Sequence, residues 1–377
     1  MDLELTGRLK AEARRLGFDQ VGIAPAVAPP GYPSYLQWLD AGYAAGMSYL
    51  ERRAEARAHP DRLLEGARSV IVVSFVYGRP GAASSPDPSR GKVARYARGS
   101  DYHELFWRRL EALLAWIEGQ CPGIRGRAVA DTAPLLERDF ARLAGLGWIG
   151  KNTMLIDRRL GSYTLLGALL VDIELAFDDP HRGGHCGTCT RCLDACPTDA
   201  FAGPYRLDAR RCISYWTIEH RGPIADEFAD QLDGWVFGCD VCQEVCPWNR
   251  KAPAGREPDL DPRPEWTDPD LLEWLGCDPA VLARSLKGTA LSRAKRSGLL
   301  RNALLVLGLR RVTAAVPRMI ERLGDPDPVI RASAAWALGR IGTPEVLAAL
   351  DARGNDPDPL VRDAVQRALG RSGDLGH

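Results

Sequence analysis

The chain has 377 residues, enough for two or three domains, and its 49 basic residues balance its 49 acidic residues. This balance excludes the overall basic charge that is typical of proteins that bind nucleic acid along their whole surface, and no run of about eighteen apolar residues is present that would cross a membrane. The ten cysteines are too sparse for a disulfide scaffold. We therefore expect a protein of the reducing cytoplasm.

The first 175 residues mix helical and strand patterns. Helical spacing of apolar residues predicts helices at residues 3–16, 102–118 and 135–144. Runs of apolar residues, rich in β-branched side chains in the middle run, predict strands at residues 20–24, 69–77 and 163–173. Residues 81–92 form a loop rich in Gly, Pro and Ser. The pattern predicts an α/β or α+β domain with room for a large cofactor.

Two cysteine runs dominate the next segment, residues 176–250. The first run has the spacing C-x2-C-x2-C-x3-C-P of bacterial ferredoxins, whose first three thiolates bind one cubane and whose fourth binds the other. The second run lacks the first position of this motif, and Cys212 is the only nearby thiol that can fill it. We therefore expect a ferredoxin-like domain with two [4Fe–4S] clusters. The expected ligands are Cys186, Cys189, Cys192 and Cys246 for one cluster, and Cys196, Cys212, Cys239 and Cys242 for the other.

Zinc is the main alternative for these cysteines, because zinc ribbons also contain C-x2-C pairs. A zinc ribbon has no use for a third cysteine at the same spacing, or for the prolines that follow Cys196 and Cys246. We therefore favour iron–sulfur clusters and one-electron transfer. Cys121 and Cys277 stand apart from the runs and are expected to be ordinary buried thiols.

The C-terminal part of the chain is repetitive. A Pro-rich linker at residues 251–280 leads to residues 281–377, where the sequence Asp-Pro-Asp-Pro at 325–328 recurs 31 residues later. Each repeat places an Asp before a Pro that can open a helix. A period near thirty predicts an α-solenoid of HEAT-like repeats. We favour a docking surface over a simple packing appendage, because solenoids usually bind a partner.

A basic stretch precedes and enters these repeats. Residues 284–322 contain ten basic residues and a single acid, Glu321. In a chain of balanced charge, such a stretch indicates a local anionic partner. The alternative is an ordinary solvated helix face.

The segment from Gly145 to Asn152 is similar to two nucleotide-binding motifs. It satisfies G-x-G-x-x-G and nearly satisfies the P-loop pattern, but both motifs require a strand immediately before the glycines. A predicted helix precedes them here, and Asn152 replaces the hydroxyl that would bind magnesium. The glycines are therefore expected to allow a bulky ligand to approach the backbone, or to form a tight turn from helix to strand.

Two aspartates stand at the starts of predicted helices. Asp131 precedes Thr132 and Pro134, and is either an N-cap or a carboxylic acid that an apolar pocket keeps protonated for donation. The sequence leaves both roles open. Asp101 and His103 open the other long helix, where a cap and a surface histidine are the simplest interpretation.

Taken together, the motifs resemble the epoxyqueuosine reductase family, iron–sulfur and cobalamin-dependent enzymes of tRNA modification. The resemblance covers nearly the whole chain. It depends on three short segments besides the eight cysteines and the repeats. These are Tyr96-Ala97-Arg98-Gly99-x-Asp101-Tyr102-His103, Asp131-Thr132-Ala133-Pro134-Leu135-Leu136-Glu137-Arg138 and Gly147-Trp148-Ile149-Gly150-Lys151-Asn152.

The resemblance implies that the chain reduces epoxyqueuosine to queuosine at the wobble position of a tRNA anticodon. Cobalamin would bind in residues 1–175 and receive electrons from the clusters, and Asp131 matches the family's proton donor. The implied surroundings of cobalamin are Arg57, Tyr96, Asp101, Tyr102, Asp131, Lys151, Asn152 and Ser162. The sequence lacks D-x-H-x-x-G, since Phe106 stands at the Gly position, so cobalt is expected without a protein histidine below it.

The implied partners are a tRNA anticodon stem-loop and an external electron donor, with the chain itself a cytoplasmic monomer. The tRNA phosphates are expected to meet the basic residues at the entry to the repeats, Lys287, Arg293, Lys295, Arg296 and Arg301. A reductive dehalogenase-like corrinoid enzyme acting on a small molecule is one alternative, although this chain has the repeats and lacks an export signal. The other alternative is a ferredoxin-type electron-transfer protein, which would bind no corrinoid.

Overall fold

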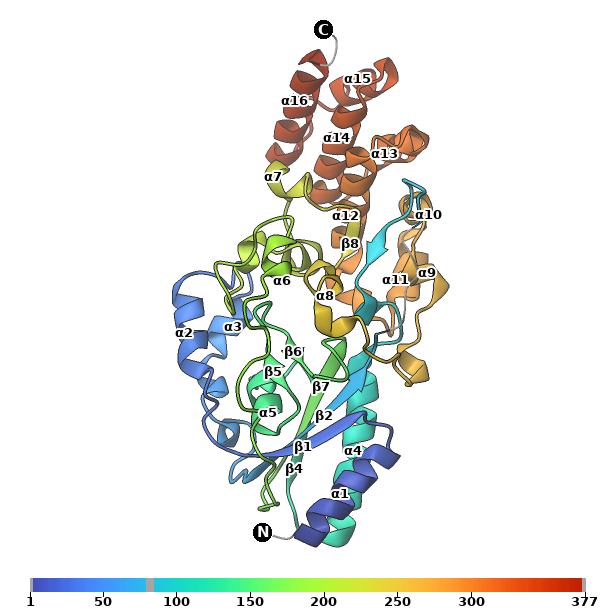
Figure 1. Ribbon diagram of the computed structural model, residues 1–377. Coiled ribbons are helices and arrows are strands. Elements are labelled where there is room, and N and C mark those ends of the chain that lie inside the picture. The colour runs from blue at the N-terminus through green and yellow to red at the C-terminus, as the bar shows by residue number, and fades with distance from the viewer. Residues whose placement is uncertain (1–2, 79–84, 375–377) are drawn as a thin grey trace. The chain divides into compact units, whose positions relative to one another are not determined.

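The computed structural model describes residues 3–78 and 85–374, which fall into two compact units. The first unit comprises residues 1–80, 99–210 and 240–261, and the second comprises residues 81–98, 211–239 and 262–377. Figure 1 shows the elements of each unit. None of the described helices is both long enough and apolar enough to pass through a membrane.

An antiparallel sheet forms the centre of the first unit. Its strand order is β1 (Gln20–Pro25), β2 (Ser69–Val76), β7 (Thr164–Val171) and β4 (Gly126–Val129). In the middle of the sheet, Val72 pairs with Gly22 on one side and with Ala168 on the other. All eight residues of β2 are buried, as its run of β-branched and apolar residues predicts for a strand covered on both faces.

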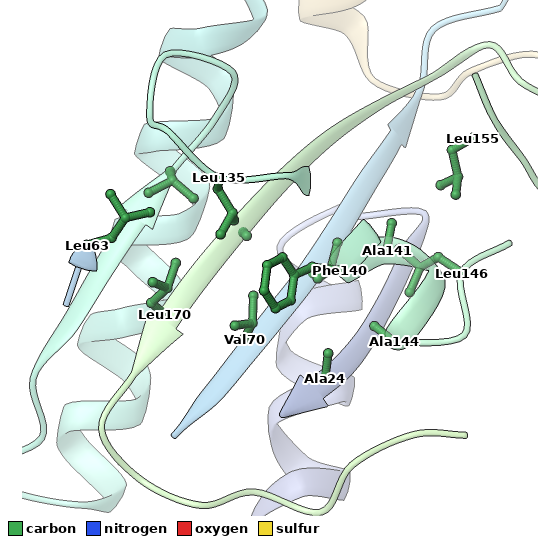
Figure 2. Close-up of a cluster of buried hydrophobic side chains, with 13 residues drawn as sticks. Ala24, Leu63, Val70, Leu135, Phe140, Ala141, Ala144, Leu146, Leu155 and Leu170 are labelled. Carbon is green, nitrogen blue, oxygen red and sulfur yellow. The ribbon is translucent and has the colours of Figure 1, made fainter. Parts of the chain in front are cut away.

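The two faces of this sheet are covered by different helices. On one face lies α4 (Tyr102–Gln120), whose Phe106 ring packs against Phe75 of β2 with centroids 5.1 Å apart. α1 (Leu3–Arg15) packs beside α4. On the other face, Phe140 of α5 (Glu137–Leu143) packs with Val70 and Leu170, as Figure 2 shows. Both helices therefore rest on the same strand, and the loops at their N-termini are positioned by the core.

Most expected elements of this unit are confirmed, with shifted ends. The three predicted strands correspond to β1, β2 and β7, and the predicted helices to α1, α4 and α5. The predicted helix at 135–144 begins two residues later, at Glu137. No sequence pattern predicted α2 (Tyr32–Asp40) or β4. Within the predicted loop at 81–92, residues 81–84 lie outside the described residues.

The glycine segment after α5 is a turn from helix to strand. β5 (Trp148–Ile149) pairs with β6 (Leu155–Ile156) directly after it. Gly147 has a φ of 159°, and a Cβ atom there would come into severe overlap with the backbone carbonyl of Ile156. Only glycine fits so close to the neighbouring strand, so the turn accounts for the motif and the two nucleotide-binding alternatives do not apply.

Stacked helices make up most of the second unit. α12 (Lys295–Leu309), α14 (Pro328–Ile341) and α16 (Pro359–Asp374) pack side by side. α10 (Leu271–Gly276), α11 (Pro279–Leu286), α13 (Val316–Arg322) and α15 (Pro344–Asp351) complete the pairs, and β3 (Lys92–Val93) pairs with β8 (Trp235–Phe237) in parallel. A Cβ on Gly308 would lie 2.6 Å from Cα of Ala337, so glycine permits the close approach of α12 and α14.

The Asp-Pro-Asp-Pro segments connect successive repeats. Asp327 caps α14 by accepting a hydrogen bond from the backbone N–H of Val329, as expected. The preceding aspartates are buried: Asp356 binds Arg331 at 2.8 Å, while Asp325 binds Arg322 at 3.2 Å and also Arg296. Part of the basic stretch therefore neutralises carboxylates inside the repeats and does not face a partner.

One arginine joins α12 to the segment that carries Cys212 and Cys239. Arg301 is fully buried, and its guanidinium donates to the backbone oxygens of Trp216, His220 and Gly222. Asn302 beside it donates to the carbonyl of Thr217 at 2.9 Å. These bonds satisfy backbone carbonyls within and just after an irregular π-helical turn, Tyr215–Glu219.

We expect Arg301→Met to destabilise the second unit by more than about 3 kcal/mol, because several buried carbonyls would lose their donor at once. Thermal and denaturant unfolding of the full chain would measure this loss. The control is Lys287→Gln, an exposed side chain for which about 0.5 kcal/mol or less is expected. Equal stability of the two variants would contradict the structural role of Arg301.

Candidate functional site

Asp131 lies in a tight turn between β4 and α5. Its φ is 54°, a left-handed conformation that is unfavourable for residues other than glycine, although Asp and Asn adopt it more readily than most. Across the turn, the N–H of Thr132 donates to the carbonyl of Ala130 at 2.5 Å, and the N–H of Asp131 donates to Oε1 of Glu137 at 2.7 Å. Backbone strain of this kind is common at functional sites.

Asp131 is not a helix cap. The N-cap position of α5 is occupied by Leu136, without a side-chain hydrogen bond. The N-cap interpretation is therefore wrong, because the helix starts later than the sequence indicated and a turn separates Asp131 from it. The side chain of Asp131 is 64 % exposed and does not cap the helix.

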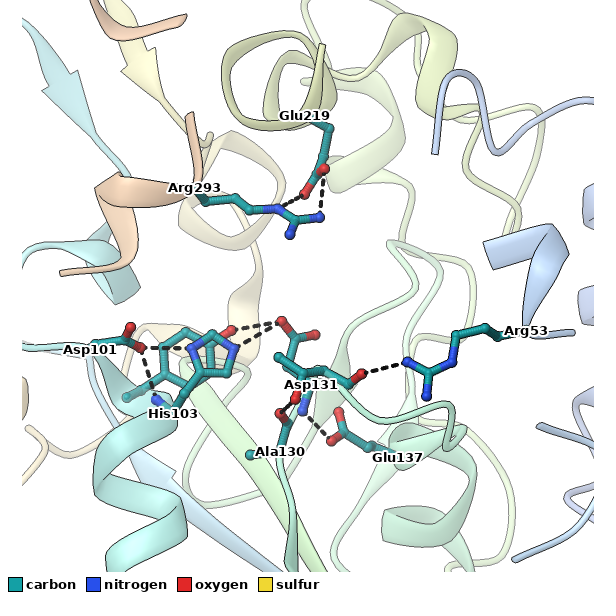
Figure 3. A network of polar contacts seen from close by, with 10 residues as sticks. Arg53, Asp101, His103, Ala130, Asp131, Glu137, Glu219 and Arg293 are labelled. Atoms are coloured by element: carbon teal, nitrogen blue, oxygen red, sulfur yellow. Dashed lines mark hydrogen bonds and ion pairs between the residues drawn. The ribbon is translucent and has the colours of Figure 1, made fainter. Parts of the chain in front are cut away.

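Two side chains of α4 bind the Asp131 carboxylate, and Asp101 at the cap of the helix holds one of them (Figure 3). The hydroxyl of Tyr102 donates to Oδ2 of Asp131 at 3.0 Å, and Nε2 of His103 lies 3.3 Å from the same oxygen. Nδ1 of His103 lies 2.7 Å from Oδ1 of Asp101, which also accepts the backbone N–H of His103 and caps the helix. The cap expected at Asp101 is confirmed, whereas His103 belongs to this network and is not an isolated surface histidine.

The network sets the charges of its members. Burial alone would lower the pKa of His103, but hydrogen bonds and charges from Asp101 and Asp131 raise it to about 9. The hydrogen bond from His103 is the main cause that holds the pKa of Asp131 below its ordinary value. Burial and the nearby charge of Asp131 raise the pKa of Glu137 to about 8. At neutral pH the resting network therefore has a charged His103, an ionised Asp131 and a neutral Glu137.

The expectation that an apolar pocket keeps Asp131 protonated is therefore wrong. Its carboxylate is surrounded by hydrogen-bond donors, which favour the ionised form. At neutral pH the proton shared by this pair is therefore on His103 and not on Asp131. The signal for this arrangement was the spacing Asp101-x-His103 at a helix start, which lets one carboxylate hold both the helix N-terminus and the imidazole ring.

The cysteines expected to bind one cluster lie close together in the first unit. Cys246 is buried in a cluster that also includes Cys186 and Trp148. Burial, together with the neighbouring thiols of Cys186 and Cys189, raises the pKa values of Cys192 and Cys246. This grouping fits a set of four thiolates around one centre. The other four cysteines are distributed over both units, and their grouping around a second cluster remains a prediction.

Buried polar atoms beside these thiols also fit an iron–sulfur cluster. The indole N–H of Trp148 and Nδ1 of His181 are buried and have no hydrogen-bond partner among the described residues. Their rings are 5.5 Å apart, and Trp148 contacts the cysteine group. A buried donor without an acceptor is rare in proteins. Sulfide or thiolate sulfur of a bound cluster would supply the acceptor that the protein lacks.

Several side chains that the resemblance assigned to cobalamin make internal contacts. Arg57 is buried and donates to the carbonyl of Arg53 at 3.0 Å. Nζ of Lys151 donates to the carbonyls of Gly187 and Cys189 at 2.7 and 3.0 Å.

Two further side chains of this set are also buried. Asn152 donates to the carbonyl of Cys242 at 3.4 Å, and Oγ of Ser162 accepts from Asn249 at 2.9 Å. Their polar groups connect the sheet domain to the cysteine segments, and their assignment to cobalamin remains a prediction. Tyr96 lies in the second unit, where its ring is 6.2 Å from that of Phe237. Within the assigned set, Asp101, Tyr102 and Asp131 lie in one hydrogen-bonded network with His103.

The basic residues expected to meet tRNA divide into two groups. Arg301 is wrong as an RNA contact because it is fully buried, and Arg296 is paired with Asp325 inside the repeats. Arg293 makes two hydrogen bonds of 2.9 Å to Glu219 and stays half exposed, so its contact with tRNA remains a prediction. Lys287 and Lys295 are exposed. Cys121 and Cys277, expected to be buried, are only half-buried.

Family models match three parts of the chain. Residues 57–132 match the model described as epoxyqueuosine reductase QueG, DUF1730. Residues 185–249 match a 4Fe-4S double cluster binding domain, and residues 289–370 match HEAT repeats. The expected fold class is confirmed by these matches, as is the assignment of the cysteine runs to a double cluster.

Known proteins similar to the chain agree with these models. An epoxyqueuosine reductase from Pseudomonas aeruginosa is 41 % identical over 346 residues, which cover 90 % of this chain and 95 % of the relative. A solved epoxyqueuosine reductase with an epoxyqueuosine-modified tRNA-Tyr stem loop has a TM-score of 0.92 at 30 % identity, covering 98 % of this chain and 99 % of that one. A Bacillus subtilis epoxyqueuosine reductase whose aspartate-bearing catalytic loop is swung out of the active site has a TM-score of 0.91, with the same identity and coverage.

Protein reconstituted without oxygen should hold about eight irons and eight sulfides per chain, from two cubanes. Cys246→Ser should reduce the iron content toward about four, because its thiol lies with Cys186, Cys189 and Cys192 and not with the other ligands of its own run. Iron and sulfide assays with electron paramagnetic resonance would measure this. Cys121→Ser, outside both runs, is the control and should keep the full content. One zinc per four cysteines would contradict the cluster assignment.

Proposed function

This chain belongs to the epoxyqueuosine reductase family, and from that relationship we propose that it reduces epoxyqueuosine to queuosine at the wobble position of tRNA, with cobalamin and two [4Fe–4S] clusters. The observation that carries the proposal is the exposed Asp131 carboxylate, held in a left-handed turn beside His103 in a chain that also carries the double-cluster segment. An oxidoreductase that removes oxygen from a substrate needs a source of electrons and a source of protons. The clusters would supply the electrons, and Asp131 would supply the protons.

The reaction converts an epoxide into an alkene. Both carbon–oxygen bonds break, a carbon–carbon double bond forms, and the oxygen leaves as water, so each turnover consumes two electrons and two protons. The chemistry that cobalamin supplies when bound is the reductive opening of the epoxide at carbon. The two clusters suit the delivery of two electrons, since each carries one at a time.

The part of Asp131 is to protonate the substrate oxygen as its bond to carbon breaks. Tyr102 and His103 both bind Oδ2 and orient the carboxyl group, while its exposed surface leaves it free to turn toward a substrate. Glu137 holds the backbone of the turn through the N–H of Asp131. A positioned acid of this kind contributes to rate because the proton arrives as negative charge develops on oxygen.

The assignment of Arg57, Tyr96, Asp101, Tyr102, Asp131, Lys151, Asn152 and Ser162 to the surroundings of cobalamin remains a proposal. Arg57, Asn152 and Ser162 are buried and bonded within the first unit, and Lys151 holds the cysteine segment. These residues fit a supporting role around the site. We also propose an external electron donor and a monomeric chain. We propose a cytoplasmic location because the substrate is tRNA.

Anaerobic incubation of the reconstituted chain, cobalamin and a reductant with epoxyqueuosine-containing tRNA should yield queuosine, measured by nucleoside mass spectrometry. Failure with tRNA, combined with dehalogenation of small aryl halides, would favour the corrinoid enzyme alternative. Absence of any bound corrinoid would favour a ferredoxin-type carrier.

Asp131→Asn should retain iron, cobalamin and fold, and lose about a hundredfold to ten-thousandfold of the turnover, the usual range for general acid catalysis. Asn tolerates a left-handed φ as well as Asp does, so the turn should survive. Asp363→Asn on the exposed surface of α16 is the matched control. A loss of less than about tenfold would remove Asp131 from the role of proton donor.

Lys287 and Lys295 are candidates for phosphate contacts. Changing both to Gln should weaken binding of the anticodon stem-loop and reduce the slope of log affinity against log salt by roughly 1.5 to 2, because two phosphates would no longer release counterions. Filter-binding assays across a salt series would measure both quantities. Arg318→Gln, an exposed residue already paired with Glu321, is the control. An unchanged slope in the double variant would place the tRNA site on other residues.

A further inference from the structure

The proposed reaction needs two protons for each turnover, but the Asp131 carboxyl holds only one at a time. The carboxyl must be reloaded before the oxygen can leave as water, either from solvent or from a neighbouring side chain. Two side chains reach its Oδ2, Tyr102 and His103, and of these His103 is the one that is charged at neutral pH and can pass on a proton as a cationic acid. This inference rests on the proposed function for the number of protons, whereas the geometry stands independently of it.

We propose that His103 reloads Asp131 between two successive proton transfers, so that one carboxyl group delivers both protons of a turnover. His103 acts through Asp131 and does not touch the substrate, which makes it a positioning and supply residue. Its Nε2 is hydrogen-bonded to Oδ2 of Asp131 at 3.3 Å, so a proton can pass directly between the two side chains.

The contacts of the ring decide which proton leaves. Nδ1 lies 2.7 Å from Oδ1 of Asp101, and that oxygen is fixed because it also caps α4. A neutral imidazole keeps its proton on the nitrogen that faces the better hydrogen-bond acceptor. In His103 this nitrogen is Nδ1, which faces Oδ1 of Asp101. The proton that His103 gives up is therefore the one on Nε2, which faces Asp131.

The surroundings keep the ring in this orientation and allow it to recover its proton. Tyr102 stacks on the His103 ring with centroids 4.0 Å apart, and Trp107 lies 6.1 Å away. The His103 side chain is 19 % exposed, so solvent can replace a lost proton. The charges that face it are the carboxylates of Asp101 and Asp131. These two keep the imidazolium charged at neutral pH, so the transfer to Asp131 is unfavourable at rest and proceeds only as negative charge on the substrate oxygen draws the proton onward.

Each turnover comprises two proton transfers from His103 through Asp131. In the first, a proton passes from Nε2 to Oδ2 of Asp131, and rotation of the exposed carboxyl presents it to the epoxide oxygen as one carbon–oxygen bond breaks. Solvent then returns a proton to Nε2. In the second, the same transfer converts the resulting hydroxyl into water as the other carbon–oxygen bond breaks and the double bond forms. The two electrons come from a one-electron donor through the clusters.

The first test is independent of turnover. Nitrogen NMR of histidine-labelled protein without cofactors should show His103 titrating near pH 9. In Asp131→Asn and in Asp101→Asn the midpoint should move down toward the ordinary value of about 6.5. A midpoint that stays the same in both variants would overturn the proposal, because the ring would then lie outside the carboxylate pair.

The second test uses the active holoenzyme. His103→Gln preserves a donor to Asp131 but cannot carry a proton, so kcat should fall by at least about tenfold while KM for tRNA stays the same. The alkaline decline of kcat near pH 9 should disappear, and added imidazole should restore part of the rate. His59→Gln, remote from the network, is the control and should behave as the native chain.

A variant that keeps the alkaline decline, or that does not respond to imidazole, would overturn the role of His103. The two failures can be told apart. If the native holoenzyme makes no queuosine while the NMR titration shifts as expected, the proposed function fails and the coupled pair of His103 and Asp131 remains. If queuosine forms but the midpoint does not move, only the reloading role fails.

Discussion

The arrangement around Asp131 depends on one carboxylate oxygen, Oδ1 of Asp101. It accepts the backbone N–H of His103 in the first turn of α4 and also holds the imidazole of the same residue. Because α4 is fixed on the sheet through Phe106, the position of this oxygen is determined by the hydrophobic core. His103 in turn determines the charge of Asp131. A change in how α4 packs would therefore alter the acid–base properties of a residue on a different element.

The opposite face of the sheet contributes to the same point. α5 rests on β2 through Phe140, and its first residue, Glu137, holds the backbone of the Asp131 turn. One strand thus supports both the helix that orients the carboxylate and the helix that holds its turn. The strain at φ 54° persists because bonds on either side determine it, which is how backbone strain is maintained at functional sites.

Sequence patterns predicted those features that depend on local periodicity or fixed spacing. The buried strand β2, the double-cluster segment and the repeats followed from such patterns. Features that depend on three-dimensional surroundings could not be predicted in this way. The count of basic residues could not reveal that Arg301 is buried against backbone carbonyls. Nor could the sequence show that a histidine 28 positions away would ionise Asp131, since that contact crosses between two elements.

The contact made by Lys151 has a consequence for electron transfer. Its ammonium group joins the glycine turn after α5 to the carbonyls of Gly187 and Cys189, within the first cysteine run. Rates of electron tunnelling fall steeply with the separation between donor and acceptor. A cation that pins the cysteine loop to the sheet domain limits thermal variation of that separation. Loss of Lys151 would loosen this link, so the separation across which electrons pass from the first cysteine run would vary more.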